Sequence, residues 1–308
     1  MMTASSPFSL PRLGLGSWPL GGGYDRGNLD ENAARKAVLA ALDLGINFID
    51  TAPVYGGGAS EEFLGRVLAG RRTQVILASK CGLVKNGSWT DHDLRPQTIR
   101  TQLEETLFRL KTDYLDLYQI HYPDPKVPLA DAVGELVRWQ EKGFIREIGL
   151  CNVSAAQIQA AAQITRVFSV QNEFSLLHPQ AGLNVFDACG RCGARFIGYG
   201  VLCGGILSGK YKTAPNLRRA DARNYFYKCY RGQAFENAQQ TVLRVKKLAQ
   251  EKGVFPSAVA LAWALHRPGV SCVLFGARND EQVRQNAAGL SVKLTAREMQ
   301  FLEGNDGN

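Results

Sequence analysis

Short apolar segments alternate with segments of helical periodicity along almost the whole chain. The apolar segments are strand-sized, and several end in a residue that can take part in chemistry. They cover residues 13–17, 46–50, 75–80, 115–121, 145–151, 167–171, 196–199 and 271–275. Between them, stripes such as Ile99, Leu103, Leu107 and Leu110 fit one face of a helix. Strands that alternate with helices pair in parallel, because each crossover returns the chain to the same end of the sheet.

The spacing of these segments favours a closed barrel. One strand recurs about every 30 residues, so the 308-residue chain holds about eight strands, as a (β/α)8 barrel requires. The rival fold is a doubly wound open sheet, which would carry a glycine-rich fingerprint after its first strand. The segment Gly14-Leu15-Gly16 fits that fingerprint poorly. We therefore predict an α/β fold, a (β/α)8 TIM barrel that forms a single domain over residues 1–308.

The interval between the seventh and eighth predicted strands is too long for a simple strand-helix unit. Residues 218–231 are polar and aromatic, whereas Val242, Val245 and Leu248 return to helical spacing. This pattern predicts a long loop, able to act as a lid, followed by an extra helix.

The composition argues against several other classes of protein. With 45% hydrophobic and 21% charged residues the chain is an ordinary globular protein. No segment approaches the roughly 20 apolar residues of a membrane helix. Residues 1–7 lack the basic start and apolar block of a signal peptide, so we expect a cytoplasmic location and no membrane partner. The net charge of +8 comes without a basic run, so we expect no nucleic-acid partner, although part of the excess can attract a phosphate-bearing ligand.

The seven cysteines are an odd number scattered through the chain, as expected of reduced thiols. Cys189 and Cys192 have Cys-x-x-Cys spacing, but no further ligands stand nearby and the pair does not open a helix after a strand. Neither a zinc site nor a redox motif is favoured, and we predict no metal.

Four residues that can carry chemistry fall at or just after the ends of successive predicted strands. Asp50, Lys80 and His121 end strands two, three and four, and Tyr55 follows in a loop that continues with Gly56. Each alone has an ordinary structural explanation. Together they predict a site, because the carboxyl ends of barrel strands converge on one mouth.

The chemistry of these side chains is complementary. A tyrosine titrates near pH 10, and we expect the Lys80 ammonium to lower the pKa of Tyr55 and make it a better proton donor. Asp50 would keep Lys80 charged, and His121 would orient a carbonyl oxygen or share the proton relay. No nucleophile-base pair or cluster of metal ligands accompanies them. Carbonyl reduction also needs a hydride, which side chains do not supply, so a nicotinamide is implied.

A phosphate site is suggested after the last predicted strand. The segment 274–282 (LFGARNDEQ) leads into a helix, whose free N–H groups suit an anion at this position of a barrel. Arg278 would add a fork suited to a phosphate, which favours NADP over NAD.

The chain resembles an aldo-keto reductase. The resemblance is carried by residues 45–52 (GINFIDTA) with Tyr55-Gly56 and Ser60-Glu61, by Ser79-Lys80, and by residues 113–121 (DYLDLYQIH). It extends from Arg12 to about Glu303, and within the family it is similar to the bacterial branch that also resembles potassium-channel β subunits. The resemblance implies a catalytic tetrad of Asp50, Tyr55, Lys80 and His121.

The same resemblance implies the residues that bind the cofactor. They are Ser17, Trp18, Asp50, Cys151, Asn152, Gln171, Tyr199, Gly200, Val201, Leu202, Cys203, Gly204, Lys210, Gly276, Arg278, Gln282, Gln285 and Asn286. Cys151 stands where the family usually has Ser, Gly200-Val201 replaces a frequent Ser-Pro, and Gln285 replaces a frequent Glu. The residues that we expect to contact the substrate are Trp18, Tyr55, Trp89, His121 and Tyr122, with the aromatic group 225–230 as a further wall.

These observations predict NADPH-dependent reduction of a small aldehyde or ketone, with the proton supplied by Tyr55. Two alternatives remain open at this point. One is a sugar or polyol dehydrogenase that works with NAD(P) in the oxidative direction. The other is a regulatory binding protein that uses a bound nicotinamide as a redox sensor. Nothing in the sequence indicates an oligomeric state.

Overall fold

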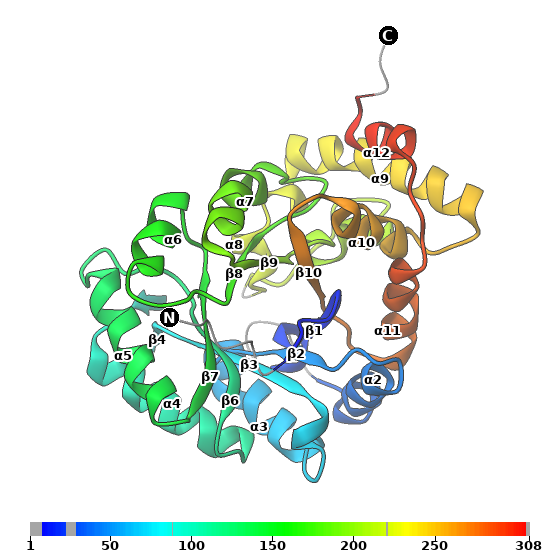
Figure 1. Ribbon diagram of the computed structural model, residues 1–308. Coiled ribbons are helices and arrows are strands. Elements are labelled where there is room, and N and C mark those ends of the chain that lie inside the picture. The colour runs from blue at the N-terminus through cyan, green and yellow to red at the C-terminus, as the bar shows by residue number, and fades with distance from the viewer. Residues whose placement is uncertain (1–7, 23–28, 88, 220, 306–308) are drawn as a thin grey trace.

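The computed structural model describes residues 8–22, 29–87, 89–219 and 221–305. The barrel strands are β1 (Leu13–Gly16), β2 (Phe48–Asp50), β3 (Ile76–Cys81), β6 (Leu115–Ile120), β7 (Ile145–Cys151), β8 (Ser169–Glu173), β9 (Arg195–Tyr199) and β10 (Val270–Phe275). They close in the order β1-β10-β9-β8-β7-β6-β3-β2, with every neighbouring pair parallel. Figure 1 shows the helices as an outer ring around these strands. The predicted (β/α)8 barrel and its strands are confirmed.

Helices connect the strands and cover the outside of the barrel. They are α2 (Glu31–Asp43), α3 (Ala59–Val67), α4 (Pro96–Leu110), α5 (Leu129–Glu141), α6 (Ala155–Ala162), α7 (Gln180–Cys192), α8 (Arg223–Phe226), α9 (Gly232–Lys252), α10 (Pro256–His266), α11 (Asp280–Ala287) and α12 (Ala296–Glu303). Their ends follow local rules. Pro96 occupies the first turn of α4, and Ser154 forms a capping box with Gln157 at the start of α6.

Short turns of 3₁₀ helix and one hairpin complete the chain. The turns are η1 (Trp18–Leu20), η2 (Tyr55–Gly58), η3 (Arg72–Gln74), η4 (Cys203–Ser208), η5 (Lys228–Tyr230) and η6 (Ala288–Leu290). The hairpin pairs β4 (Leu83–Asn86) with β5 (Trp89–His92) in antiparallel fashion after β3.

The barrel interior explains how the site is placed. One buried apolar cluster consists of Phe48, Ile76, Ala78, Leu117, Phe168, Ile197, Cys272 and Leu274. Side chains alternate along a strand, so the residue two positions beyond a cluster member shares its inward face. Asp50, Lys80 and Gln119 stand two positions after Phe48, Ala78 and Leu117 respectively. The polar layer therefore lies directly above the apolar one, toward the carboxyl ends of the strands.

The opposite end of the barrel is closed by the segment that precedes β1. Phe8 packs against Phe168, which stands just before β8, with their ring centroids 4.9 Å apart, and Leu10 joins the same cluster. The carboxyl ends of the strands are thus the side at which a ligand can reach the barrel interior.

The long connection between β9 and β10 contains more helix than the sequence pattern indicated. The predicted loop 218–231 includes α8 and η5, and the predicted extra helix is α9, which begins earlier, at Gly232. The pattern did not reveal α10. Its residues from Ser257 to Leu265 are all buried, so it has no polar face and no amphipathic stripe.

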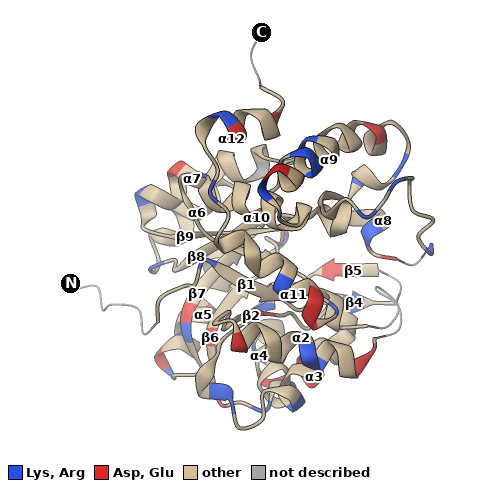
Figure 2. Ribbon diagram, turned by 90° about the vertical axis from the view of Figure 1, so that its right-hand side faces the viewer, with Lys and Arg blue, Asp and Glu red and all other residues tan. Residues whose placement is uncertain are grey.

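Charged residues are distributed over the outside of the barrel. Figure 2 shows basic and acidic segments interspersed on the outer helices. None of the helices in the described part of the chain combines the length and the apolar character of a membrane span. Residues 1–7, on which the expected location rested, lie outside the described residues. Residues 306–308, at the other end of the predicted domain 1–308, also lie outside them.

Candidate active site

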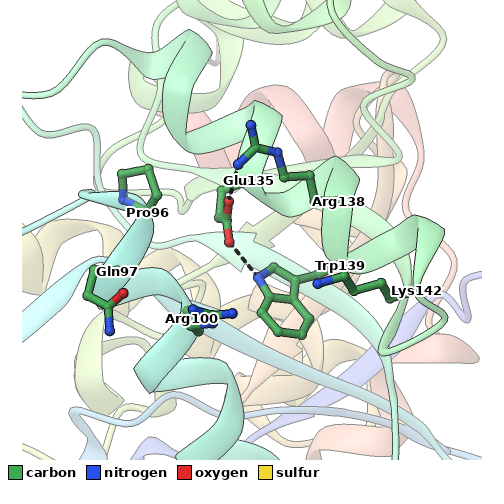
Figure 3. Close-up of a pocket in the computed structure, with 7 residues that line it drawn as sticks. All are labelled: Pro96, Gln97, Arg100, Glu135, Arg138, Trp139 and Lys142. Atoms are coloured by element: carbon green, nitrogen blue, oxygen red, sulfur yellow. Dashed lines mark hydrogen bonds and ion pairs between the residues drawn. The ribbon is translucent and has the colours of Figure 1, made fainter.

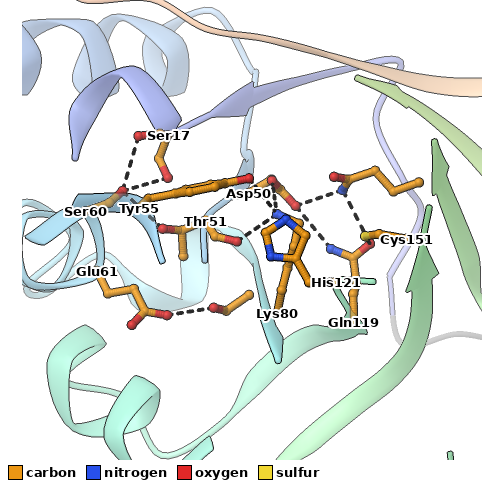
Figure 4. Close-up of polar contacts among 12 residues, drawn as sticks. Ser17, Asp50, Thr51, Tyr55, Ser60, Glu61, Lys80, Gln119, His121 and Cys151 are labelled. Carbon is orange, nitrogen blue, oxygen red and sulfur yellow. Dashed lines mark hydrogen bonds and ion pairs between the residues drawn. The ribbon is translucent and has the colours of Figure 1, made fainter. Parts of the chain in front are cut away.

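The four predicted catalytic residues meet at one rim of the barrel. Lys80 Nζ donates hydrogen bonds to Asp50 Oδ2 at 2.6 Å and to the Thr51 carbonyl oxygen at 2.8 Å. It also lies 3.3 Å from the Tyr55 hydroxyl oxygen. The His121 ring meets the Tyr55 ring edge-on, with their centroids 6.0 Å apart. Figure 4 shows these side chains converging; Asp50 comes from β2, Lys80 from β3, Tyr55 from η2, and His121 from the position directly after β6. The meeting of strand ends expected from the sequence therefore occurs.

Glycines after Tyr55 allow the turn η2 to lie against η1. Gly56 has a φ of 63° and Gly57 a φ of 65°, a left-handed conformation that glycine adopts without strain. A Cβ on Gly56 would stand 2.2 Å from the Gly21 carbonyl oxygen. This close approach leaves no room for a side chain on Gly56, the residue directly after Tyr55.

The expected fall in the pKa of Tyr55 is wrong. Burial raises that pKa, and the Lys80 charge lowers it by less, so the pKa of Tyr55 lies at about 12. Asp50 adds to the rise, because its negative charge disfavours a second anion nearby. Tyr55 is consequently protonated throughout the neutral range, so its phenol holds a proton and little phenolate is present.

Two further groups of the rim, Lys80 and His121, each hold one charge state near pH 7. Burial lowers the pKa of Lys80, but the attraction of Asp50, with Tyr55 and Cys151, outweighs it and raises that pKa overall. Burial, the Lys80 charge and His92 hold the pKa of His121 well below its usual value. The rim therefore carries an ammonium and a neutral imidazole.

Two glutamines that hold Asp50 extend the site across the barrel interior. Gln119 Nε2 and Gln171 Nε2 donate to Asp50 Oδ1 at 3.1 Å and 2.9 Å, while Lys80 takes the other carboxylate oxygen. Cys151 Sγ lies 3.6 Å from Gln119 Oε1. Gln119 was not among the predicted site residues. The feature that could have indicated Gln119 is its place as a polar residue inside a fully buried strand, two positions before His121.

The predicted cofactor residues on the other side of the mouth are linked by hydrogen bonds to the rim that holds Tyr55 and His121. Tyr199 OH donates to Asn152 Oδ1 at 2.7 Å, and Asn152 Nδ2 donates to the His121 carbonyl oxygen at 2.9 Å. Asn152 adopts a φ of 55°, so its backbone turns sharply after β7. On the near side, Ser60 Oγ donates to Ser17 Oγ at 2.8 Å and joins α3 to the end of β1.

The predicted pyrophosphate segment forms a tight turn after β9. Gly200, Cys203 and Gly204 have φ values of 69°, 45° and 63°, and Val201 and Leu202 lie between them. Lys210 follows, with its side chain against Gly205. At Gly200 and Gly204 the backbone of this turn carries no side chain, as close approach of a diphosphate requires.

The residues predicted for the adenosine phosphate gather at the turn from β10 into α11. Asn279 caps α11, and the Arg278 amide donates to Gln282 Oε1 at 2.9 Å. Gln285 Nε2 donates to Glu281 Oε1 at 3.0 Å, and Asn286 is buried in the same helix. Gly276 lies against η1, where a Cβ would stand 2.7 Å from Pro19 Cγ. The structure thus brings the predicted cofactor residues to three neighbouring parts of one mouth.

Comparison with known proteins identifies the family. The model of the aldo/keto reductase family matches residues 12–305. The chain belongs to the aldo/keto reductase family. It is therefore an oxidoreductase of a family whose members use nicotinamide cofactors.

Individual relatives match the aldo-keto reductase over most of its length. It is 34% identical to the aldo-keto reductase YhdN of Bacillus subtilis (strain 168), over 91% of this chain and 85% of that protein. It is 31% identical to the NADH-specific methylglyoxal reductase of Escherichia coli (strain K12), over 94% and 93%. The structure of the glycerol dehydrogenase AKR11B4 from Gluconobacter oxydans matches with a TM-score of 0.86 and 32% identity, covering 96% of this chain and 91% of that chain.

The predicted substrate residues of the aldo-keto reductase are only partly brought together. Tyr122 stacks on His121 at 5.5 Å, and Trp18 meets Phe226 of the long loop edge-on at 5.4 Å. Trp89 lies instead at the tip of the β4–β5 hairpin, with 78% of its surface exposed. Its expected place in the substrate wall thus has no support from this arrangement.

A cavity of about 240 Å³ lies outside the barrel, between α4 and α5 (Figure 3). Its Glu135 accepts hydrogen bonds from Trp139 Nε1 at 2.8 Å and from Arg138 at 3.2 Å. These contacts join neighbouring turns of α5. The cavity is lined by α4 and α5 and by none of the rim residues, so it is separate from the candidate site.

Proposed function

We propose that this aldo-keto reductase uses NADPH to reduce a small aldehyde or ketone to the alcohol, and that Tyr55 donates the proton to the carbonyl oxygen. The observation that carries the proposal is the Tyr55 hydroxyl, 3.3 Å from a Lys80 ammonium that Asp50 holds at 2.6 Å. It stands at the open end of the barrel, beside the neutral ring of His121.

The residues around the mouth fit a nicotinamide dinucleotide. Among the described residues, His121 Nδ1 and Glu173 Oε1 are buried without a hydrogen-bond partner. His121 directly follows β6 and Glu173 is the last residue of β8, two strands that end at this mouth. The turn after β9 carries glycines in the left-handed conformation, and Arg278 stands at the start of α11, where a phosphate is favoured. When bound, the nicotinamide supplies the hydride that reaches the carbonyl carbon.

The chain's own residues hold the proton and donate it to the substrate oxygen. Tyr55 holds it on the phenol oxygen at neutral pH, because burial keeps its pKa high. As the proton leaves, the Lys80 ammonium stabilises the phenolate that remains, and Asp50 with the Thr51 carbonyl keeps that ammonium in place. The neutral His121 ring offers a hydrogen bond that orients the substrate oxygen. Gln119 and Gln171 fix Asp50 from the other side.

The proposal is tested by steady-state rates with NADPH and NADH on a panel of aldehydes, ketones and the matching alcohols. We expect kcat/KM with NADPH to exceed that with NADH by about 10- to 100-fold, since a charge-assisted hydrogen bond contributes about 1.5–3 kcal/mol. Arg278→Ala should remove most of this preference and leave the NADH rate unchanged.

Arg284→Ala is the matched control for that variant. Arg284 lies on the same helix, but its side chain is largely exposed and pairs with Asp280 at 3.5 Å. Its replacement should change neither cofactor's kcat/KM. Equal use of NADH and NADPH by the parent enzyme would refute the NADPH preference, and inertness on the whole panel would refute the reduction itself.

Oxidation of an alcohol is the second candidate, favoured by the similarity to the structure titled as a glycerol dehydrogenase. It uses the same residues in reverse, with the Tyr55 phenolate accepting the proton. A pKa of about 12 leaves little phenolate at neutral pH, which favours reduction under those conditions.

The two directions should respond differently to pH. Reduction needs protonated Tyr55, so its kcat/KM should not fall through deprotonation of Tyr55 at neutral pH, because the pKa is about 12. Oxidation needs the phenolate, so its kcat/KM should rise about tenfold per pH unit between roughly pH 7 and pH 10. Rates measured in both directions across this range test the assignment. A plateau of the oxidation rate near pH 8 would contradict it.

A further inference from the structure

Two buried glutamines and one cysteine form a hydrogen-bonded network around Asp50 in the barrel interior (Figure 4). Both glutamines donate to the same carboxylate oxygen, Gln119 Nε2 at 3.1 Å and Gln171 Nε2 at 2.9 Å. Gln119 Oε1 in turn accepts from Gln171 Nε2 at 3.4 Å and from Cys151 Sγ at 3.6 Å. Gln119 and Cys151 are fully buried, and Gln171 is 3% exposed. These side chains are therefore held by one another rather than by water.

The charge of Asp50 determines the direction of both amides. A carboxylate paired with an ammonium only accepts hydrogen bonds, so each glutamine turns its nitrogen toward Asp50. Gln119 consequently places its oxygen toward Gln171 and Cys151, where it accepts. Gln171 then has an acceptor for each of its two N–H groups, the Asp50 carboxylate and the Gln119 oxygen.

Gln119 restrains Gln171 in a way that Asp50 alone does not. A single hydrogen bond holds the nitrogen of an amide but allows the amide plane to turn about that bond. A second acceptor in another direction fixes the plane, because both N–H groups lie in it. Among the described residues, the second acceptor for Gln171 is Gln119 Oε1.

The oxygen of the Gln171 amide is left for a ligand. Gln171 pairs with Ile197 of β9, whose side chain belongs to the apolar cluster inside the barrel, so Gln171 also points inward. It stands two residues before the carboxyl end of β8. Within the described chain no group donates to Gln171 Oε1, and this oxygen is not among the buried atoms without a partner, so it borders open space. Gln171 thus presents an acceptor, and no donor, to a molecule in the mouth.

We propose that Gln119 is a positioning residue that holds the Gln171 amide with its oxygen toward the mouth, so that the enzyme selects dinucleotides whose pyridine ring carries a hydrogen-bond donor. This inference rests on the proposed use of a nicotinamide dinucleotide. The carboxamide of nicotinamide has a carbonyl acceptor and an N–H donor, and only the donor matches Gln171 Oε1. A ring substituent without a donor would leave this oxygen unbonded after its removal from water, which weakens binding.

Three dinucleotides that differ only in the pyridine substituent test the direction of Gln171. They are oxidised NADP, its thionicotinamide analogue, which keeps the N–H donor, and its acetylpyridine analogue, which keeps the carbonyl and has a methyl group in place of the NH₂. Quenching of tryptophan fluorescence gives their dissociation constants in the full-length parent protein. We expect the acetylpyridine analogue to bind about 10- to 100-fold more weakly than NADP, and the thionicotinamide analogue to stay within about threefold. Equal affinity for all three, or weaker binding of the thionicotinamide than of the acetylpyridine analogue, overturns the acceptor role of Gln171.

Variants at Gln119 test its positioning role. Gln119→Met fills a similar space but removes both contacts, so the affinity ratio of NADP to its acetylpyridine analogue should fall by about 3- to 10-fold. Gln119→Glu should keep the parent ratio. Burial beside the Asp50 charge keeps the introduced carboxyl protonated, so it donates to Asp50 and accepts from Gln171 as the amide does. Gln119→Ser, whose hydroxyl is too short to reach either partner, carries the expectation for Gln119→Met if that variant does not fold.

Gln102→Met is the matched control. Gln102 is another buried glutamine, which accepts from the Gly82 amide at 2.8 Å and donates to the Leu83 carbonyl oxygen at 2.7 Å. It lies on α4, so its replacement should lower the unfolding free energy without changing the affinity ratio. An unchanged ratio in folded Gln119→Met, or an equal change in Gln102→Met, overturns the positioning role. A parent protein that binds none of the three dinucleotides shows the failure of the proposed function instead.

Discussion

Replacing Tyr55 with Phe is expected to lower kcat for carbonyl reduction by about 10²–10⁴-fold, the usual contribution of a positioned general acid. The change removes one oxygen atom, the one that lies 3.3 Å from Lys80 Nζ, and leaves the ring that meets His121. Water is a poor substitute, because the phenol is buried beside the rim. The NADPH dissociation constant, measured by fluorescence titration, should stay within about threefold of the parent value, since less than 1 kcal/mol of binding is at stake.

Tyr114→Phe provides the matched control for this loss. Tyr114 precedes β6 at the far end of the barrel, where Arg72 and Arg146 each stack on its ring at 4.0 Å. The stacking survives removal of the hydroxyl, so turnover should be unchanged. Full activity of the Tyr55→Phe enzyme would show that the proton comes from elsewhere, and loss of NADPH binding would show that Tyr55 mainly shapes the cofactor site.

The meeting of the rim residues could be predicted from sequence because strand order and strand period determine it. Once alternating strands and helices indicate a barrel, the ends of successive strands must meet. Asp50, Lys80 and His121 follow from that rule alone. Gln119 could have been found by the same rule, since it faces inward two positions after Leu117.

The electrostatics of the rim could not be predicted in the same way. The sequence shows that Lys80 is near Tyr55, and this correctly gives the direction of the lysine's effect. It does not show how completely Tyr55 is removed from water, and burial is the larger influence on its pKa. The sign of the net shift was therefore wrong.

The cysteines show a related limit. Spacing drew attention to Cys189 and Cys192, but burial and the neighbouring Cys192 raise the pKa of Cys189 to about 12, and both residues lie at the end of α7. The long loop likewise carries no motif that predicts where it packs. Tyr230 reaches the Gly204 carbonyl oxygen because this loop folds back on the turn after β9, a tertiary event that local sequence does not encode.

Lys80→Met is expected to destabilise the fold as well as to stop turnover. The Lys80–Asp50 pair is 2.6 Å long, and the two side chains are 1% and 3% exposed. Removing the ammonium leaves the Asp50 carboxylate buried with only neutral donors, Gln119 and Gln171. Breaking one partner of a buried pair costs about 3–5 kcal/mol of unfolding free energy. Asp50→Asn should have a similar cost, because it leaves the Lys80 charge without its carboxylate.

The double variant Asp50→Asn with Lys80→Met separates stability from chemistry. The double variant buries no unpaired charge. Its loss of unfolding free energy, measured in urea, should therefore be smaller than the sum of the losses in the two single variants, with a coupling of about 0.5–3 kcal/mol. Turnover should nevertheless stay lost, because neither an ammonium nor its carboxylate remains beside Tyr55. The exposed pair Arg66–Glu31, 3.0 Å apart, is the control, and the same cycle there should give a coupling of about 0.2–1 kcal/mol at most. A double variant no more stable than additive losses predict would mean that the two charges act independently, and the positioning of Lys80 by Asp50 would then have to be abandoned.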